Sequence, residues 1–129
     1  MVNVTDLMVL GAPNSHPHAL SNEKFNEIFT PDRPIHFSYH GYPIELAGLL
    51  FGRPNLERVS MEGYREEGTT TTPLAMMVLN QVSRYDVAKV AITAARKVND
   101  KVDPVADKLL QQIDKQVDDF WKYIKETGK

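Results

Sequence analysis

The chain is organised around the stretch Gly-Tyr-Arg-Glu-Glu-Gly-Thr-Thr-Thr-Thr-Pro at residues 63–73, which is expected to join a short apolar strand to a helix. Gly63 and Gly68 allow backbone angles that are closed to other residues. Four consecutive threonines disfavour a helix, since each is β-branched and stiff at χ1. Thr72 suits the N-cap of the following helix, and Pro73 suits its first position. We therefore predict an ordered strand-to-helix loop at one edge of an α/β layer.

The composition indicates one domain over residues 1–129, with a helical tail from about residue 100. The chain has 129 residues, formal net charge −2, 42% hydrophobic residues and 25% charged residues. Mild acidity without a basic stripe argues against nucleic acid as a partner. The chain has no cysteine, which excludes disulfides and thiolate chemistry. No apolar run approaches the length of a membrane span, so we expect a cytoplasmic protein without membrane contact.

Strand and helix patterns alternate in the first half of the chain. A helix over Asn22–Phe29 is capped by Ser21, and a second helix starts at Pro43 and stops before Gly52. Strands are expected at Val2–Leu10, Ile35–Tyr39 and Leu56–Met61. A strand, a glycine turn and a helix at this spacing are typical of a mostly parallel sheet flanked by helices. The expected fold class is therefore α/β.

The rest of the chain is expected to be helical. A helix follows Pro73, and Ser83 with Asp86 has the capping-box spacing that begins another. That helix carries a periodic apolar face of Val87, Val90, Ala91, Ala94 and Val98. Asp103 is the expected cap of a last, amphipathic helix that runs to about Thr127. Its apolar stripe is interpreted as core packing or a docking face.

Candidate site residues follow the expected strands. Ligands of parallel α/β sheets bind beyond the carboxyl ends of the strands, where His40 lies. A contact to a loop backbone or a neighbouring domain is the simpler interpretation, because no partner acid or nucleophile is visible for general-base work. The threonine run precedes a helix N-terminus, which offers N–H groups to an anion, although Glu66 and Glu67 oppose this. The candidates for an anion or interdomain contact are His40, Tyr64, Arg65, Thr69, Thr70, Thr71 and Thr72.

No residue pattern predicts catalysis or a metal site. The sequence lacks a Gly-rich dinucleotide fingerprint, a P-loop and a nucleophile elbow. The adjacent charges at residues 65–67 are typical of a solvated or salt-bridged turn. His16 and His18 lie two apart, but no third metal ligand is near them in the sequence. We therefore predict no catalytic residue, no metal ligand and no cofactor in this chain.

Several motifs together resemble the C-terminal domain of bacterial phosphoketolases, over roughly residues 2–98. They are Val2-Asn3-Val4-Thr5-Asp6-Leu7-Met8, His16-Pro17-His18-Ala19-Leu20-Ser21, Phe37-Ser38-Tyr39-His40-Gly41-Tyr42-Pro43, the stretch at 63–73, Val78-Leu79-Asn80 and Arg84-Tyr85. The threonine-containing stretch is the most specific of them. After Val98 the match is only a general helical tail.

The resemblance implies a larger parent enzyme. Phosphoketolases are lyases of carbohydrate metabolism that split xylulose 5-phosphate, and often fructose 6-phosphate, with inorganic phosphate into acetyl phosphate and an aldose phosphate. Their thiamine diphosphate and Mg²⁺ lie between two earlier domains from two subunits, and the third domain is peripheral. The resemblance therefore implies a three-layer, transketolase-like C-terminal domain, with upstream catalytic domains as partners, a homo-oligomer and an inactive fragment. Consistently, no Gly-Asp-Gly motif occurs in the chain.

The chain departs from the family pattern in two places. Residues 51–57 replace a basic, histidine-bearing stretch of many relatives. The first strand–helix unit, upstream of Val2, is missing, and the resemblance places its strand between Val2–Leu10 and Ile35–Tyr39. We expect this gap to favour self-association, whereas direct pairing of the two strands or a rearrangement of the helices gives a monomer. The alternative function, from another class, is an independent binding module that senses an anionic metabolite at Thr69–Pro73.

Overall fold

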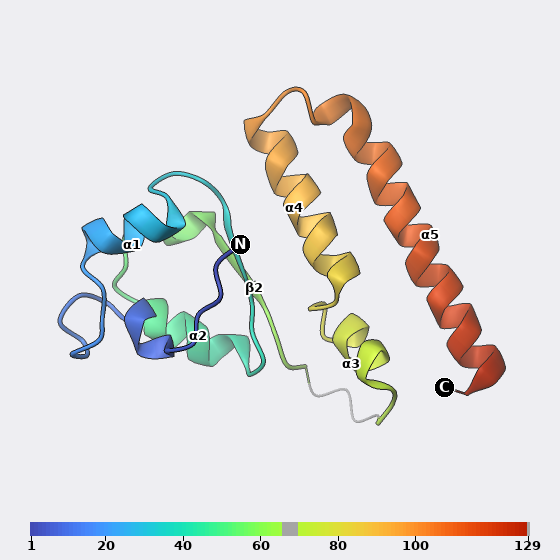
Figure 1. Cartoon of the computed structure of the whole chain (residues 1–129), viewed down its shortest axis with the longest axis horizontal. Helices are drawn as coiled ribbons and strands as arrows, with labels where there is room; N and C mark the ends of the chain where they lie inside the picture. Colours follow the sequence, from blue (N-terminus) through green and yellow to red (C-terminus); the bar gives the residue numbers. More distant parts are fainter. Residues whose placement is uncertain (66–69, 129) are drawn as a thin grey trace. The chain divides into compact units, whose positions relative to one another are not determined.

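A computed structural model describes residues 1–65 and 70–128. The chain divides into two compact units, residues 1–64 and residues 65–129. The first unit contains a parallel sheet flanked by helices, and the second is helical (Figure 1). The α/β class predicted from the sequence is confirmed. Each unit is described by itself below.

The first unit is built on a parallel βαβ arrangement. The elements are η1 (Leu7–Leu10), α1 (Asn22–Phe29), β1 (Ile35–Ser38), α2 (Pro43–Leu50), η2 (Leu56–Arg58) and β2 (Val59–Glu62). β1 pairs with β2 in parallel, from Ile35 opposite Val59 to Ser38 opposite Glu62. Because parallel neighbours need a crossover, α2 runs between them. The parallel arrangement expected from the strand–glycine–helix spacing is therefore present.

The core of this unit lies on one face of the sheet. Side chains alternate along a strand, so Ile35 and Phe37 share a face while His36 and Ser38 share the other. The apolar face packs against residues of η1, α1 and α2, which are Leu10, Phe25, Phe29, Leu46 and Leu50. The opposite face carries His36 and Ser38 from β1 and Ser60 and Glu62 from β2.

The predicted strand at Val2–Leu10 is wrong. The Asp6 side chain accepts a hydrogen bond from the Met8 N–H at 2.9 Å, which starts the 3₁₀ turn η1 instead of a ladder. Leu10 is fully buried, and Val4 and Leu7 pack beside the core, so the apolar content serves packing without strand pairing. Within residues 1–65 and 70–128, the sheet therefore has two strands and not three.

Arg53 connects the segments around this core. Its side chain is only 4% exposed, and it donates hydrogen bonds to Leu10 O (3.2 Å), Val9 O (3.2 Å) and Asn22 Oδ1 (3.0 Å). The guanidinium also lies 4.5 Å from the centroid of the Phe25 ring. These partners are two carbonyls, an amide and a ring, and none is a carboxylate. Arg53 therefore ties η1 and the start of α1 to the turn after α2.

The second unit consists of α3 (Pro73–Leu79), α4 (Arg84–Val98) and α5 (Asp103–Thr127). The predicted caps are confirmed at two starts: Thr72 Oγ1 accepts from the Ala75 N–H, and Ser83 with Asp86 forms a complete capping box. At α5 the N-cap is Val102, one residue before the predicted Asp103. Asp103 instead accepts a hydrogen bond from Arg96, so its carboxylate serves the α4–α5 pair.

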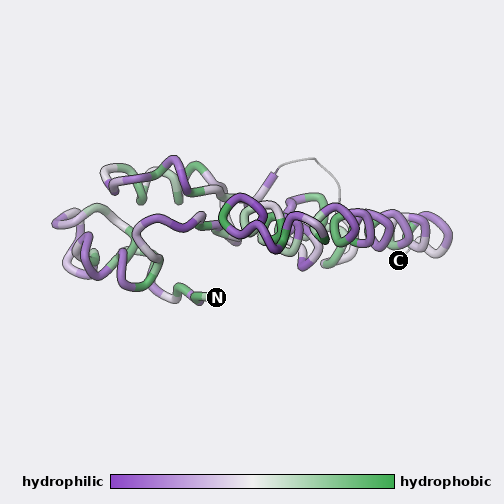
Figure 2. The backbone as a smooth tube through the Cα atoms, turned by 90° about the horizontal axis from the view of Figure 1, so that it is seen from above, coloured by the Kyte–Doolittle hydropathy of each residue, from purple (hydrophilic) through white to green (hydrophobic). Residues whose placement is uncertain are grey.

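Both long helices have a polar and an apolar side. The coil that ends at the C-terminus is mostly purple, with shorter green and pale stretches, as expected for an amphipathic helix (Figure 2). Ion pairs join the polar sides: Arg96 contacts Asp103 at 2.7 Å and Asp107 at 2.9 Å, and Lys89 pairs with Asp114. Among the described helices, none combines the length and the apolar character that crossing a membrane requires.

Candidate functional site

The candidate site of the first unit lies just beyond the carboxyl ends of β1 and β2. Backbone pairing continues past both strands, because the Tyr39 N–H donates to Glu62 O at 2.9 Å and the Tyr64 N–H donates to Gly41 O at 2.8 Å. These bonds hold the residues that follow β1 beside those that follow β2. The predicted candidates His40 and Tyr64 are therefore brought together by the sheet itself.

Three rings form a cluster at this end, which we call the aromatic cluster: His40, Tyr42 and Tyr64. The rings of His40 and Tyr64 meet edge to face with centroids 5.9 Å apart, and Tyr42 lies 5.8 Å from Tyr64. Both tyrosines are 40% exposed, so part of the cluster remains open to solvent. It offers ring faces and hydroxyl groups, which suit a packing contact better than proton transfer. Tyr42 was missed as a site residue, although it follows the His40-Gly41 turn directly.

Gly63 allows the segments that follow β1 and β2 to approach each other closely. A Cβ on Gly63 would lie 2.3 Å from Gly41 O and 3.0 Å from Tyr39 O. Only a residue without a side chain fits there, because backbone atoms cannot give way as a flexible side chain can. The predicted reason for Gly63 was an unusual backbone angle, but its φ is not in the positive range. The correct reason is close approach of two backbones.

The other predicted candidates belong to the second unit. The Arg65 N–H donates to Asn80 Oδ1 at 2.8 Å, and Arg65 Nη2 donates to Gln81 Oε1 at 3.0 Å. Arg65 is thus engaged with the end of α3. Thr72 caps α3, Thr71 is half-buried and Thr70 is exposed. Thr69 lies outside the described residues, as do Glu66, Glu67 and Gly68.

The paired histidines of the N-terminal loop contact their own loop. His18 Nδ1 lies 2.7 Å from Asp6 Oδ2, and the His18 N–H donates to His16 Nδ1 at 3.1 Å. The Met8 N–H, together with His18, lowers the pKa of the Asp6 carboxyl below its ordinary value. In residues 1–65 and 70–128, no group of three or more histidine, aspartate or glutamate side chains is arranged to hold a metal ion.

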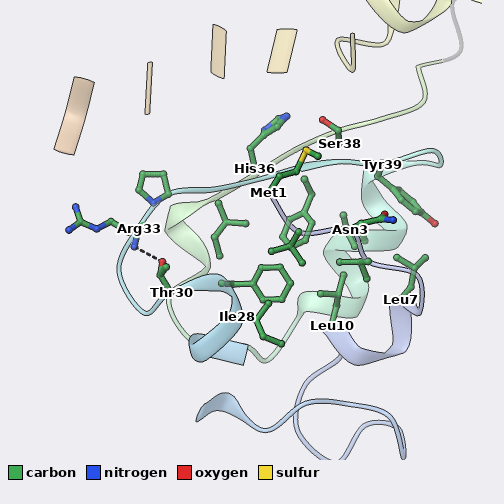
Figure 3. A pocket seen from close by; sticks show the side chains of 17 residues that line it. Met1, Asn3, Leu7, Leu10, Ile28, Thr30, Arg33, His36, Ser38 and Tyr39 are labelled. Atoms are coloured by element: carbon green, nitrogen blue, oxygen red, sulfur yellow. Dashed lines mark hydrogen bonds between the residues drawn. The ribbon is translucent and has the colours of Figure 1, made fainter. Parts of the chain in front are cut away.

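A cavity of about 420 Å³ runs along the outer edge of β1. Its apolar lining includes Val2, Val4, Leu7, Ile28, Ile35 and Phe37. Met1 and Asn3 enter it from the N-terminal segment and Ile28 from α1, while His36 and Ser38 extend to the other side of β1 (Figure 3). The backbone N–H and C=O groups of the odd-numbered residues of β1 point toward β2, as those of Tyr39 do just after the strand. The backbone groups of His36 and Ser38 therefore point toward the outer edge. The cavity therefore combines apolar walls with an edge of β1 that pairs with no strand in residues 1–65 and 70–128.

Comparison with known proteins gives one family. The family model described as the XFP C-terminal domain matches residues 1–129. A probable phosphoketolase of Schizosaccharomyces pombe is 55% identical over 95 residues, covering 74% of this chain and 11% of that protein. Probable phosphoketolases of Brucella abortus and Rhodopseudomonas palustris strain HaA2 are 38% and 40% identical, over 129 and 121 residues, covering 100% and 94% of this chain. The chain spans only 16% and 14% of these two relatives.

Proposed function

The chain belongs to the family of XFP C-terminal domains, and from this we propose that it is the non-catalytic C-terminal domain of a cytoplasmic phosphoketolase. The parent enzyme cleaves xylulose 5-phosphate, and fructose 6-phosphate in some members, with inorganic phosphate to acetyl phosphate and an aldose phosphate. The observation that carries this proposal is the alignment of all 129 residues with only 16% of a longer probable phosphoketolase.

The residues that the structure describes form no site for the metal ion of the proposed parent enzyme. Mg²⁺ is held by carboxylate and carbonyl oxygens that converge on one point. Within residues 1–65 and 70–128, acidic and histidine side chains form no such group. The sequence also lacks a Gly-Asp-Gly motif. We therefore assign thiamine diphosphate and Mg²⁺ to the upstream part of the parent chain.

The open edge of β1 supports a role as part of a larger polypeptide. Parallel sheets occur almost only where both faces are covered, and a two-stranded sheet is marginally stable by itself. The cavity beside β1 has room for an extended segment, and its apolar lining suits alternating apolar side chains. In the proposed parent enzyme, upstream polypeptide fills this position, and the catalytic domains are the partners of this one.

The aromatic cluster fits a contact between domains. Half-exposed tyrosines are enriched at protein interfaces, because each presents an apolar ring and a polar hydroxyl. His40, Tyr42 and Tyr64 stand at the carboxyl ends of both strands, held there by backbone bonds. We assign to this cluster a positioning contact with the catalytic part of the parent enzyme.

The alternative of an anion-sensing module at Thr69–Pro73 stays a prediction. Thr69 lies outside the described residues, and the Thr72 hydroxyl is engaged with the Ala75 N–H. The helix behind the loop, α3, has only seven residues, so its dipole is small. No contact of the described residues favours this function over the first.

Calorimetric titration of the 129-residue chain with thiamine diphosphate and Mg²⁺ tests the proposal. We expect no saturable heat of binding, with the full-length Brucella abortus relative as the positive control. One-to-one binding at micromolar affinity would contradict a non-catalytic domain. A second titration, with inorganic phosphate alone, tests the anion-sensing alternative, which requires saturable binding there.

A further inference from the structure

The aromatic cluster presents ring faces at the carboxyl ends of both strands. The rings of His40 and Tyr64 are inclined at 86°, and those of Tyr42 and Tyr64 are inclined at 57°. A parallel stack covers the faces of neighbouring rings, whereas inclined rings leave ring faces open between them. Both tyrosines are 40% exposed, so solvent reaches them. The cluster therefore has the form of an open cage with aromatic walls.

The electrostatics of this cage favour a cation. The face of an aromatic ring is the negative end of its quadrupole, so it attracts an ammonium or guanidinium group within about 6 Å of the ring centroid. Carboxylates belong to the same segments. The Tyr39 ring packs against Gly41, and its hydroxyl donates to Glu45 Oε2 at 3.4 Å. Glu62 ends β2, two residues before Tyr64. These groups suit a cation better than an anion.

Two arginines of the chain already bind aromatic rings through their guanidinium groups. Arg53 lies 4.5 Å from the centroid of the Phe25 ring, and Arg84 lies 4.8 Å from the centroid of the Tyr85 ring. The Arg84 guanidinium also donates to the Tyr85 hydroxyl at 2.7 Å. A guanidinium is planar and weakly hydrated, so it stacks on a ring more readily than a lysine ammonium. The aromatic cluster offers the same kind of contact with more than one ring.

We propose that the aromatic cluster binds the guanidinium group of an arginine in the catalytic part of the parent enzyme. This inference rests on the proposed function, and it names the chemistry of the contact assigned to the cluster. Arginine and tyrosine are both enriched at protein interfaces. The chain spans 16% of the Brucella abortus relative, so most of the proposed parent polypeptide lies outside it and can supply the arginine. A small free cation is the other source of the same chemistry.

Titration of the 129-residue chain with ethylguanidinium, followed by nuclear magnetic resonance of the ring protons, tests the cation site. Ethylurea is the matched probe, because it has a similar planar shape without the charge. At constant ionic strength, ethylguanidinium should shift the ring resonances of His40, Tyr42 and Tyr64 saturably, and ethylurea should not. Equal shifts with the two probes, or no saturable shift with ethylguanidinium, would overturn the cation site.

Substitutions of Tyr64 separate the contribution of its ring from that of its hydroxyl. Tyr64→Leu should weaken ethylguanidinium binding by about threefold, as expected for loss of one exposed cation–π contact, whereas Tyr64→Phe should keep close to the wild-type affinity. Tyr123→Leu, at an exposed tyrosine of α5, is the matched control and should leave the affinity unchanged. An equal loss with Tyr64→Leu and Tyr64→Phe, or no loss with Tyr64→Leu, would overturn the proposal. If Tyr64→Leu unfolds the chain, Tyr42→Leu takes its place.

Photo-crosslinking in a longer enzyme distinguishes the two sources of the cation. The protein is the Brucella abortus relative in which this chain replaces the 129 matching residues, with p-azidophenylalanine in place of Tyr64. Crosslinks should join this position to residues next to an arginine of the upstream part. A chimera that forms acetyl phosphate but gives no such crosslink would overturn the arginine contact and leave the proposed function in place. A folded but inactive chimera would contradict the proposed function, whereas the titration of the isolated chain decides the cation site separately.

Discussion

Replacing Arg53 by methionine tests whether one buried arginine holds the first unit together. The substitution keeps a long apolar stem but removes the guanidinium. It therefore deletes the hydrogen bonds to Val9 O, Leu10 O and Asn22 Oδ1, and the contact with the Phe25 ring. Methionine provides no donor, so the buried bond to Leu10 O and the partly buried bond to Val9 O are both lost. The segments joined by Arg53 are η1, the start of α1 and the turn after α2.

The loss of unfolding free energy expected for Arg53→Met follows from two opposing contributions. Hydrogen bonds from a charged donor make net contributions of about 1.5–3 kcal/mol each, so three independent bonds would contribute roughly 4.5–9 kcal/mol. Burial of a guanidinium without a carboxylate costs several kcal/mol, and the same burial lowers the pKa of Arg53 below its ordinary value. The net loss of unfolding free energy for Arg53→Met is therefore about 3 kcal/mol, near the ~3–5 kcal/mol seen when one partner of a buried ionic contact is removed.

Urea unfolding followed by circular dichroism measures this loss. The matched control is Arg33→Met, because the Arg33 guanidinium is exposed and lies 3.7 Å from the carboxylate of the exposed Asp32. The control should change the unfolding free energy by less than about 1 kcal/mol. Arg53→Lys should lie between the two, since a lysine ammonium cannot reach three acceptors in the planar pattern of a guanidinium. Equal midpoints for Arg53→Met and Arg33→Met would show that Arg53 does not hold the first unit together.

Three further predictions concern other positions. Gly63→Ala should lower the unfolding free energy by about 1–3 kcal/mol, because its methyl group would overlap Gly41 O; an unchanged melting temperature would argue against this close approach. Burial lowers the pKa of His36 and outweighs the opposing effect of Glu62, so the unfolded chain takes up the proton at a higher pH than the folded chain. The unfolding free energy should therefore fall as the pH drops below about 6.5. His36→Gln should flatten this pH dependence in urea titrations between pH 5 and 8, and an unchanged dependence would contradict it. Ser83→Ala should cost about 1 kcal/mol in thermal unfolding by removing a capping box, and a loss below a few tenths would contradict that role.

The protonation of His36 has a clear structural reason to be unfavourable. Its Nδ1 lies 2.9 Å from Ser60 Oγ, and its Nε2 is enclosed without a hydrogen-bond partner among the described residues. An imidazolium carries a proton on both nitrogens, so the second N–H would be buried without an acceptor. The direction of the pH effect therefore follows from the geometry as well as from burial.

Local signals in the sequence predicted much of the fold. Ser21, Thr72 and Ser83 were recognised as helix caps, and each side chain accepts the expected backbone N–H. Prolines at helix starts predicted the first residues of α2 and α3. Such signals act within three or four residues, so a sequence displays them directly. His40 and Tyr64 were both named as site candidates, and the structure brings them together because each follows a strand of the parallel pair.

Contacts between distant segments were not visible in the sequence. The apolar residues of Val2–Leu10 suggested a strand, but Asp6 bonds the local backbone and starts a turn. Arg53 reaches acceptors 31 to 44 residues away, and no pattern identifies such partners. Arg58 similarly donates to the carbonyls of Phe29, Thr30 and Arg33 after α1. Long-range polar contacts depend on the folded arrangement, and local propensity does not encode them.

Acetyl phosphate formation from xylulose 5-phosphate and inorganic phosphate tests whether this chain is a non-catalytic domain of a phosphoketolase. Two proteins are compared: the 129-residue chain alone, and the Brucella abortus relative in which this chain replaces the 129 matching residues. A non-catalytic C-terminal domain predicts no product from the chain alone and phosphoketolase activity in the folded chimera. Turnover by the chain alone, or a folded chimera without activity beside an active parent, would contradict the account.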